Sequence, residues 1–221
     1  MGQPLIERLA VLRAESLSRM RRTPLVRALL GGDLPRRAYA RYLLDVHHYA
    51  QHSASVIAMA GARSVAGHPE VAGYLIRHAA EELGHEVWAR EDLTALGLSA
   101  DEIDLARPSA GCMCMIGLEY FWAAHGNPVA LLGWTFALEA LGDDLGHLAA
   151  SAIVGLATEG GRMTRFLRGH GQADHEHIQD IVAVIERHVS RPVDQEDLFY
   201  VASRSAELYA QIVEDAGRQP S

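Results

Sequence analysis

The segment from Phe166 to Ile185 constrains the fold of this chain most strongly, because it places ionisable side chains on an otherwise apolar helix face. His170, Asp174 and His177 are spaced i, i+4 and i+7, so an α-helix brings all three within roughly 60° of one another. Phe166 and Ile185 lie on the same stripe, which is the face that a helix normally buries. Charged groups on a buried face need a compensating partner, so we expect this helix to pack around a polar site.

Two interpretations of this triplet remain open from its spacing alone. The side chains could form a hydrogen-bonded network inside the core, as single buried histidines commonly do. Alternatively, they could bind a metal ion, since two imidazoles and a carboxylate around an open coordination position are typical of iron(II) sites. Three ligand-type residues on one stripe favour the metal site.

A second polar group is predicted on a helix over residues 69–96. The apolar stripe of this helix contains His78, Glu82 and His85, whose spacings of four and three residues keep them on the inward face. The adjacent Glu81 falls one step round the helix and is not predicted to point inward. Glu82 and His85 form an E-x-x-H pair, which carboxylate-bridged di-iron sites use because both side chains reach one metal from one turn.

A third candidate is Glu139, on a helix predicted from residue 128 to about 158. The segment LLGWTFALEAL is apolar nearly all round, which indicates a central, buried helix, and Glu139 is its one charge over the first three turns. A buried carboxylate is unfavourable unless it is protonated, paired with an arginine or bound to a metal, and these alternatives stay open.

These helices together supply three carboxylates and three imidazoles as candidate metal ligands. The candidates are Glu82, His85, Glu139, His170, Asp174 and His177. Such a set suits iron or manganese better than zinc, which prefers thiolates or fewer ligands, or magnesium, which avoids imidazole. Two ions fit six ligands and leave coordination positions for dioxygen and a substrate.

The rest of the chain shows helical periodicity and no strand-like alternation. This pattern predicts an all-α fold in a single domain over residues 1–221. Besides the segments above, helices are predicted at residues 4–20, 24–30, 35–66, 109–124, 162–189 and 194–216, with a disordered tail at residues 217–221.

Composition excludes several classes of protein. The net charge is −8 and the positive residues are spread along the chain, so a nucleic-acid surface is not predicted. The chain contains no lysine, which excludes Schiff-base chemistry, the phosphate-binding loop with its lysine, and a Ser-Lys nucleophile pair. No G-x-G-x-x-G motif follows a strand-like segment, so the dinucleotide-binding fingerprint is also missing.

Cysteine usage and hydropathy predict a soluble cytoplasmic protein. The only two cysteines, Cys112 and Cys114, are one residue apart in an apolar run, which suits neither a disulfide framework nor a zinc site. The N-terminal segment has no uninterrupted apolar stretch and no cleavage site of a secretory signal. The longest charge-free run, from Tyr120 to Leu138, is broken by His-Gly-Asn-Pro, so no membrane-spanning helix is predicted.

The combination of motifs resembles the haem-oxygenase-like di-iron oxidase and oxygenase family, the iron-containing redox enzymes, over residues 35 to 190. The resemblance rests on the H-x3-D-x2-H triplet, on Glu139 and on the segment AAEELGHE. It implies a seven-helix bundle related in fold to thiaminase II and the pyrroloquinoline quinone synthase, without haem. It also implies two iron ions, Fe(II) or Fe(III), with dioxygen as co-substrate, an external electron donor and a homodimer. Some members of this family carry a carboxylate seven residues before the ligand histidine that corresponds to His85, and this chain has His78 at that position. His78 is therefore a candidate seventh metal ligand, or a hydrogen-bond donor to one of the ligands.

The motifs and the resemblance predict a non-haem di-iron enzyme that uses dioxygen to oxidise a small amino-acid-derived or fatty-acid-like substrate. The reaction would be N-oxygenation, C–H cleavage or oxidative C–C cleavage with decarboxylation. A cofactorless thiaminase-like hydrolase of the same fold is an alternative and would need Cys112 or Cys114 as its nucleophile. A ferritin-like bundle is another alternative, although residues 35–66 lack the glutamate that it requires. Haem binding is disfavoured because the first helix has no histidine, and a non-enzymatic interaction protein would use the polar residues as a core network.

The sequence leaves the substrate open. His48 and His52, with the nearby Tyr49, are candidates for a pocket that holds a small polar acid or amine, or they form a polar seam between helices. The apolar helix around Trp134 and Phe136 would equally hold an alkyl chain.

Overall fold

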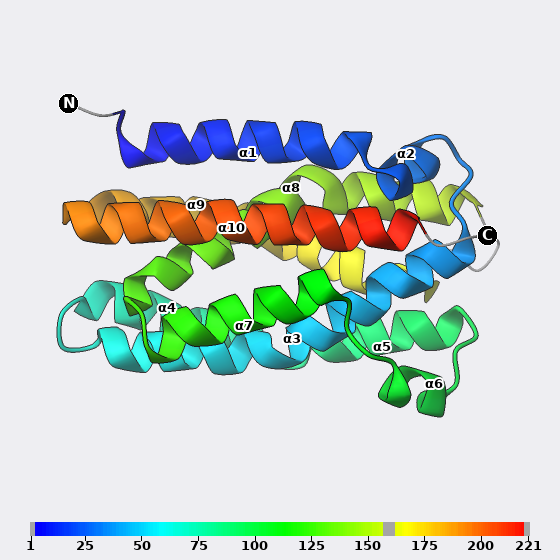
Figure 1. Ribbon diagram of the computed structural model, residues 1–221, viewed down its shortest axis with the longest axis horizontal. Helices are drawn as coiled ribbons and strands as arrows, with labels where there is room; N and C mark the ends of the chain where they lie inside the picture. The colour runs from blue at the N-terminus through cyan, green and yellow to red at the C-terminus, as the bar shows by residue number, and fades with distance from the viewer. Residues whose placement is uncertain (1–2, 157–161, 219–221) are drawn as a thin grey trace.

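A computed structural model describes residues 3–156 and 162–218, apart from the side chains of residues 147, 154–156 and 171–175. Within these residues the regular secondary structure is helical and contains no strand, as the sequence predicts (Figure 1). The elements are α1 (Leu5–Arg22), α2 (Pro24–Leu30), α3 (Arg36–Ser64), α4 (Pro69–Glu81), α5 (His85–Ala95), α6 (Ala100–Leu105), α7 (Ala110–Ala124), the 3-10 helix η1 (Pro128–Ala130), α8 (Leu131–Leu156), α9 (Arg165–His188) and α10 (Pro192–Gly217).

Seven long helical segments build the described bundle. In this count α4 and α5 are one interrupted helix, and the short helices α2 and α6 are left out. The seven segments are α1, α3, the α4–α5 pair, α7, α8, α9 and α10. The expected all-α, seven-helix architecture is confirmed. The tail predicted from residue 217 lies mostly outside the described residues, although Gly217 itself still belongs to α10.

The prediction of one continuous helix over residues 69–96 was wrong. α4 ends at Glu81 and α5 begins at His85, directly after Gly84, which has a φ of 94°. Glycine adopts this left-handed conformation without steric strain, which is why helices often end beside it. The spacing of the inward polar residues continues across residues 82–84, so the sequence pattern does not reveal the interruption between α4 and α5. Glu82 therefore caps α4 and His85 opens α5, instead of sharing one regular turn.

The contacts of α9 bring the candidate ligand helices together. α9 packs against α8 and also contacts α4 and α5. Figure 1 shows α1 along the top of the bundle, α10 in front of α8 and α9, and α3, α4, α5 and α7 forming the lower part. Side chains that point from α4, α5 and α8 toward α9 consequently meet in the interior.

α8 is the central helix that its apolar sequence predicts. Leu131 and Leu132 are fully buried, and burial of each leucine side chain contributes about 1.5–3 kcal/mol to stability. A side chain at Gly133 would come within 2.1 Å of the carbonyl oxygen of Leu198. Glycine at this position allows α8 and α10 to pack backbone against backbone.

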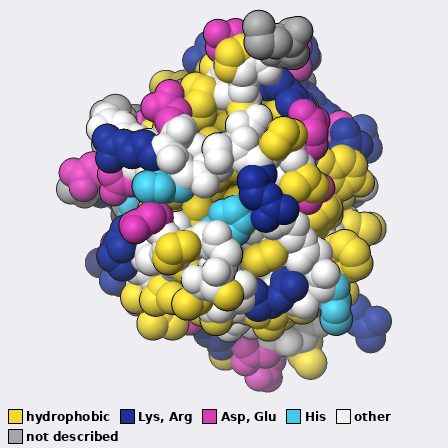
Figure 2. Space-filling model, turned by 90° about the vertical axis from the view of Figure 1, so that its left-hand side faces the viewer, with side chains coloured by type: hydrophobic (Ala, Val, Ile, Leu, Met, Phe, Trp, Pro, Cys, Tyr) yellow, Lys and Arg dark blue, Asp and Glu magenta, His cyan; other side chains and the backbone are white. Residues whose placement is uncertain are grey.

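Charged side chains of both signs cover the end of the bundle that Figure 2 shows. Acidic and basic groups are interspersed there with hydrophobic ones, and no broad patch of one sign covers this face. Among the described residues, no helix combines the length and the apolar character that crossing a membrane requires.

Candidate metal centre

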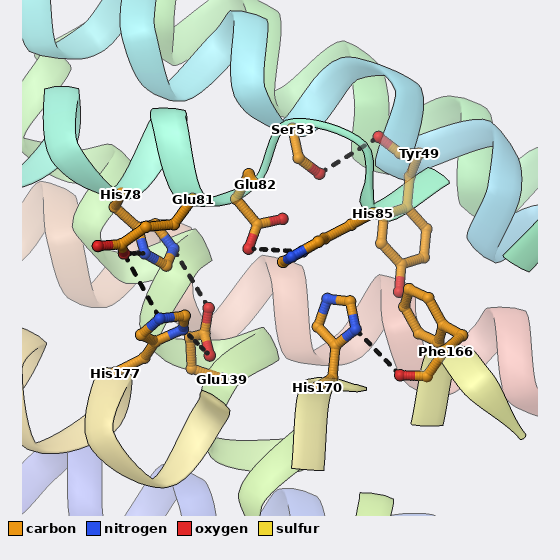
Figure 3. Close-up of polar contacts among 10 residues, drawn as sticks. All are labelled: Tyr49, Ser53, His78, Glu81, Glu82, His85, Glu139, Phe166, His170 and His177. Atoms are coloured by element: carbon orange, nitrogen blue, oxygen red, sulfur yellow. Dashed lines mark hydrogen bonds and ion pairs between the residues drawn. The ribbon is translucent and has the colours of Figure 1, made fainter. Parts of the chain in front are cut away.

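Ligand-type side chains gather inside the bundle in two neighbouring groups of three. The first cluster consists of His78, Glu139 and His177, and the second cluster consists of Glu82, His85 and His170. Within each cluster, one candidate ligand atom from each residue lies within 4.8 Å of the others. Figure 3 shows side chains from α4, the α4–α5 junction, α8 and α9 converging on this region.

The first cluster is centred on the carboxylate of Glu139. Glu139 Oε1 lies 3.2 Å from His78 Nε2, and Glu139 Oε2 lies 3.3 Å from His177 Nδ1. Burial opposes ionisation of Glu139, but hydrogen bonds with His177 and His78 outweigh it and hold the pKa of this carboxyl below its ordinary value. The hydrogen bond to Glu139 in turn raises the pKa of His177. A buried carboxylate such as Glu139 was expected to need a partner, and two histidines are its partners in the structure.

The second cluster joins the α4–α5 junction to α9. Glu82 Oε1 lies 3.3 Å from His85 Nδ1, and the rings of His85 and His170 are 4.7 Å apart. His170 Nδ1 lies 3.1 Å from the carbonyl oxygen of Phe166, which can only accept, so Nδ1 carries the proton. The lone pair of His170 Nε2 is then free for a cation. Burial lowers the pKa of His170, which favours the neutral imidazole that a metal requires.

Buried nitrogen atoms that make no hydrogen bond favour a cation at each cluster. His78 Nδ1 and His85 Nδ1 are buried and make no hydrogen bond. His85 Nδ1 and Glu82 Oε1 are close but lack hydrogen-bond geometry, as expected of two ligands that face a common point. Burying such nitrogen atoms without a hydrogen bond is unfavourable, and an ion between each of them and its neighbouring carboxylate would compensate for that.

Asp92 on α5 anchors the start of α9, a role that was not predicted from the sequence. Its two carboxylate oxygens accept hydrogen bonds from the backbone N–H groups of Arg165, at 2.8 Å, and Phe166, at 3.0 Å. Asp92 is fully buried, and burial raises its pKa to about 6 although these two hydrogen bonds lower it. Because α5 also carries His85 and α9 carries His170, this anchor sets the distance across the second cluster. The inward position of Asp92 could have been predicted from the sequence, because Asp92 lies seven residues after His85 and therefore on the same face of the helix.

Trp88 supports the second cluster from its outer side. Its ring stacks on His85 with centroids 4.2 Å apart and meets the ring of His170 edge to face at 5.7 Å. A side chain at Gly169 would come within 2.4 Å of the Trp88 ring, so glycine lets the indole lie directly against α9. The two imidazoles are thereby held in fixed orientations.

The structure brings together five of the six residues predicted as ligands: Glu82, His85, Glu139, His170 and His177. Asp174 lies on α9 between the two histidines, but its side chain is outside the described residues. His78, predicted only as an additional candidate, takes a full place in the first cluster.

For His48 and His52 the sequence left two interpretations open, a pocket and a polar seam between helices, and neither residue is among the described residues that line the cavity beside the clusters. His52 Nδ1 instead lies 3.0 Å from the hydroxyl of Tyr120 on α7, so His52 belongs to a seam between α3 and α7. Tyr49 and Ser53, each one residue further along α3, do line the cavity. A shift of one residue turns a helical side chain by about 100°, which explains the difference.

Glu81 touches the first cluster from the solvent side. Its side chain is 55% exposed, in agreement with its predicted position off the inward stripe. Glu81 Oε2 nevertheless lies 3.5 Å from His177 Nε2 and 3.6 Å from His78 Nδ1 (Figure 3). The first cluster thus has a carboxylate at its outer edge, and no equivalent contact is found at the second cluster among the described residues.

A cavity of about 120 Å³ opens beside both clusters. His78, Glu82, Glu139 and His170 line one part of it, and apolar side chains of α1, α2, α8 and α10 line most of the remainder. Of the aromatic residues that the sequence proposed for an apolar pocket, Trp134 lines this cavity, whereas Phe136 is buried elsewhere in the core.

Solved structures share this architecture. The chain is similar to a domain of unknown function with a haem oxygenase-like fold from Shewanella denitrificans, with a TM-score of 0.84 at 22% identity over 98% of this chain and 93% of that one. It is similar to a TenA homologue from Pseudomonas syringae, with a TM-score of 0.78 at 15% identity over 97% of each chain. It is also similar to a haem oxygenase from Leptospira interrogans, with a TM-score of 0.69 at 14% identity over 96% of this chain and all of that one (100%). At these identities the likeness shows the haem-oxygenase-like fold.

Family membership follows from the sequence match. No curated protein matches the chain significantly. The model of one family does match, over residues 40–210, and this range includes both clusters. The chain therefore belongs to the family of iron-containing redox enzymes.

Proposed function

We propose that this protein is a non-haem di-iron enzyme that activates dioxygen to oxidise a small-molecule substrate. The observation that supports this proposal most directly is the pair of adjacent interior clusters, each with two imidazoles and one carboxylate. A site of nitrogen and oxygen ligands with open positions suits iron, and membership of an iron-containing family agrees with that choice. Two iron ions bound here would supply the electrons that reduce dioxygen and the oxidising power that attacks the substrate.

The surrounding residues orient the ligands and exclude water. The Phe166 carbonyl fixes the tautomer of His170, and Trp88 holds the ring of His85. Glu139 contacts both histidines of the first cluster and keeps them in place. The apolar walls of the cavity keep bulk water from the reacting groups, which limits side reactions.

A cofactorless thiaminase-like hydrolase is the alternative within this fold, and the TenA-like neighbours agree with it at the level of fold. This activity needs a nucleophile at the substrate. Neither Cys112 nor Cys114 is among the described residues that line the cavity. The thiol of Cys112 is buried against the backbone carbonyl of Asp45 at 3.4 Å, and burial raises its pKa, so it is a poor nucleophile. These observations favour the di-iron proposal.

Haem is a second alternative, because haem oxygenases share the fold. A cavity of about 120 Å³ is smaller than the roughly 150 Å³ that accommodates benzene, so a porphyrin ring does not fit without rearrangement.

Anaerobic titration with Fe(II), followed by metal counting and exposure to oxygen, tests the proposal. We expect two iron ions per chain and oxygen consumption by the loaded protein. Glu139→Gln should weaken iron binding at the first cluster and His170→Ala at the second, while helical content stays unchanged. Glu186→Gln and His188→Ala, at exposed positions of α9, are the matched controls and should bind two ions. Full iron loading in the cluster variants, or no iron in the unmodified protein, would refute the proposal.

A further inference from the structure

The outer face of α7 is exposed and apolar. α7 lies on the near side of the bundle, in front of α3 (Figure 1). Met113 and Phe121 point away from the core, with 54% and 55% of their surfaces exposed. Residues 108–126 contain a single carboxylate, Glu119, and no arginine or lysine, and Glu119 is fully buried. The outer face of α7 therefore carries neither a carboxylate nor a guanidinium group.

This uncharged surface continues onto α3, which packs against α7. Residues 50–62 contain no acidic residue, arginine or lysine, and Ser55 and Ala58 are exposed among them. These positions lie beside His52, whose Nδ1 is 3.0 Å from the hydroxyl of Tyr120 on α7. The chain has 28 acidic and 20 basic residues, and charges of both signs are interspersed on the end of the bundle in Figure 2. The surface over α3 and α7 departs from that pattern.

The area of this surface is sufficient for a protein interface. Tyr200 on α10 extends it, because its ring lies 6.1 Å from that of Trp122 on α7. Phe121 and Tyr200 are each about half exposed and present roughly 100 Å² each. With Met113 and the smaller residues of α3 and α7, the surface amounts to roughly 700 Å², close to the roughly 800 Å² that each partner buries in a standard interface. Monomeric proteins rarely expose an apolar patch of this size, so we expect a partner to cover it.

The order of residues along α7 suits contact with an identical helix. Ala110, Gly117 and Ala124 are seven residues apart and share one stripe, and such small side chains let a second helix approach to about 8 Å between axes. Met113 and Phe121 lie four residues before and four residues after Gly117. A two-fold axis at Gly117 between antiparallel helices would therefore place Met113 of each copy beside Phe121 of the other. Alanine in place of Gly117 would fit as Ala110 and Ala124 do.

We propose that the outer face of α7, with the adjoining surface of α3, binds the same face of a second copy of this chain across a two-fold axis. The absence of charge disfavours a nucleic acid or a charged protein as the occupant, whereas an identical face is complementary in both size and polarity. The ion pair of Arg204 and Glu207 on α10, which packs against α7, supplies a polar rim. This inference does not depend on the proposed di-iron function, because no residue of either cluster lies on α7.

Sedimentation equilibrium of the purified full chain tests the interface. We expect twice the 24.1 kDa mass of one chain at micromolar concentration. Met113→Glu and Phe121→Arg each place a charge in the apolar contact and should weaken the dimer about 100-fold or more, while circular dichroism stays unchanged because both positions are exposed. Val11→Glu, at an exposed apolar position of α1, is the matched control and should remain dimeric. A monomeric unmodified protein, or a dimer that withstands both charges, would overturn the proposal.

Mixing the two charged variants tests the antiparallel arrangement. In a heterodimer the new carboxylate at position 113 of one copy meets the new guanidinium at position 121 of the other. The second contact of the same heterodimer keeps the native Met113 and Phe121. We expect native mass spectrometry to show a heterodimer in the mixture, although each variant alone is monomeric. A mixture that stays monomeric would show that positions 113 and 121 do not meet across the interface.

Disulfide formation tests the position of the two-fold axis. In a Cys114→Ser background, Gly117→Cys brings two thiols together at the axis, with Cα atoms about 4–6 Å apart, which suits a disulfide. We expect mild oxidation to yield a covalent dimer on a non-reducing gel. Native Cys114 lies three residues from the axis, so its thiol is about 9 Å along the helices from the partner's and should not pair. Val11→Cys in the same background is the control. Equal cross-linking of Val11→Cys, or none of Gly117→Cys, would overturn the placement of the axis.

Discussion

Gly169→Ala is the perturbation that best separates the two clusters. A methyl group at this position would lie 2.4 Å from one carbon of the Trp88 ring and 2.7 Å from a second, well inside van der Waals contact. The backbone of α9 cannot move easily, because Asp92 anchors its start, so the indole has to shift. Trp88 stacks on His85, and its displacement removes the support of that imidazole.

Two opposing effects determine the change in stability. Overpacking of this kind costs roughly 1–3 kcal/mol, whereas alanine in place of glycine inside a helix contributes about 1 kcal/mol. We expect the free energy of unfolding to fall by about 0–2 kcal/mol, so the variant should remain folded. Iron bound to the second cluster should weaken much more than iron bound to the first, because only the second contains His85 and His170.

The assay combines urea denaturation with an anaerobic Fe(II) titration. We expect the variant to bind one iron ion tightly and the second with about 10- to 100-fold lower affinity, as is usual when support behind a ligand is lost. Gly117→Ala is the matched control, because a methyl group at that position would meet no atom within 4 Å, and it should be stabilising with two ions bound. Two equally tight ions in Gly169→Ala would refute the role assigned to Trp88.

Three further predictions test the outer carboxylate, the anchor of α9 and the ions themselves. Glu81→Gln should slow Fe(II) association about 2- to 10-fold in stopped-flow mixing, because it removes negative charge at the edge of the first cluster, while Glu70→Gln on the exposed start of α4 should have no effect. Asp92 has a folded-state pKa of about 6, above its unfolded value, so its contribution to stability is fully present below about pH 4 and is lost as the pH rises through 6. The stability of the unmodified protein relative to Asp92→Asn should therefore decrease by about 2 kcal/mol between pH 4 and pH 7 in urea denaturation, and a pH-independent difference would contradict the raised pKa. Removal of iron by a chelator should lower the Tm, with a loss of about 2.7 kcal/mol relative to iron at 100 times its Kd, and an unchanged Tm would indicate a metal-free core network.

Helical periodicity explains which parts of the site the sequence could predict. The i, i+4, i+7 spacing predicted that His170 and His177 share one helix face, and both side chains lie in the interior clusters. The same reasoning chose the buried Glu82 over the more exposed Glu81. Glu139 stood out because it is the one charge at the start of an apolar helix. These predictions depend only on the repeat of a single helix, which local sequence determines.

Errors arose where the path of the chain departs from one regular helix or where a neighbouring helix decides the outcome. A left-handed glycine at Gly84 divides the predicted helix over residues 69–96, although the inward spacing continues across it. For His48 and His52, periodicity left a pocket and a polar seam between helices both open, because it does not say which neighbour a helix face meets, and the contact of His52 with Tyr120 on α7 favours the seam for His52.

The sequence by itself determined that the chain is all-α and that three of its helices carry polar residues on buried faces. Only the tertiary structure decided that these residues divide into two clusters, that His78 joins Glu139 and His177, and that Asp92 ties α5 to α9. The physical reason is that the 3.6-residue repeat fixes directions around one helix axis. The distances between side chains on different helices depend on how whole helices pack, which is set by the sum of many weak contacts along their lengths.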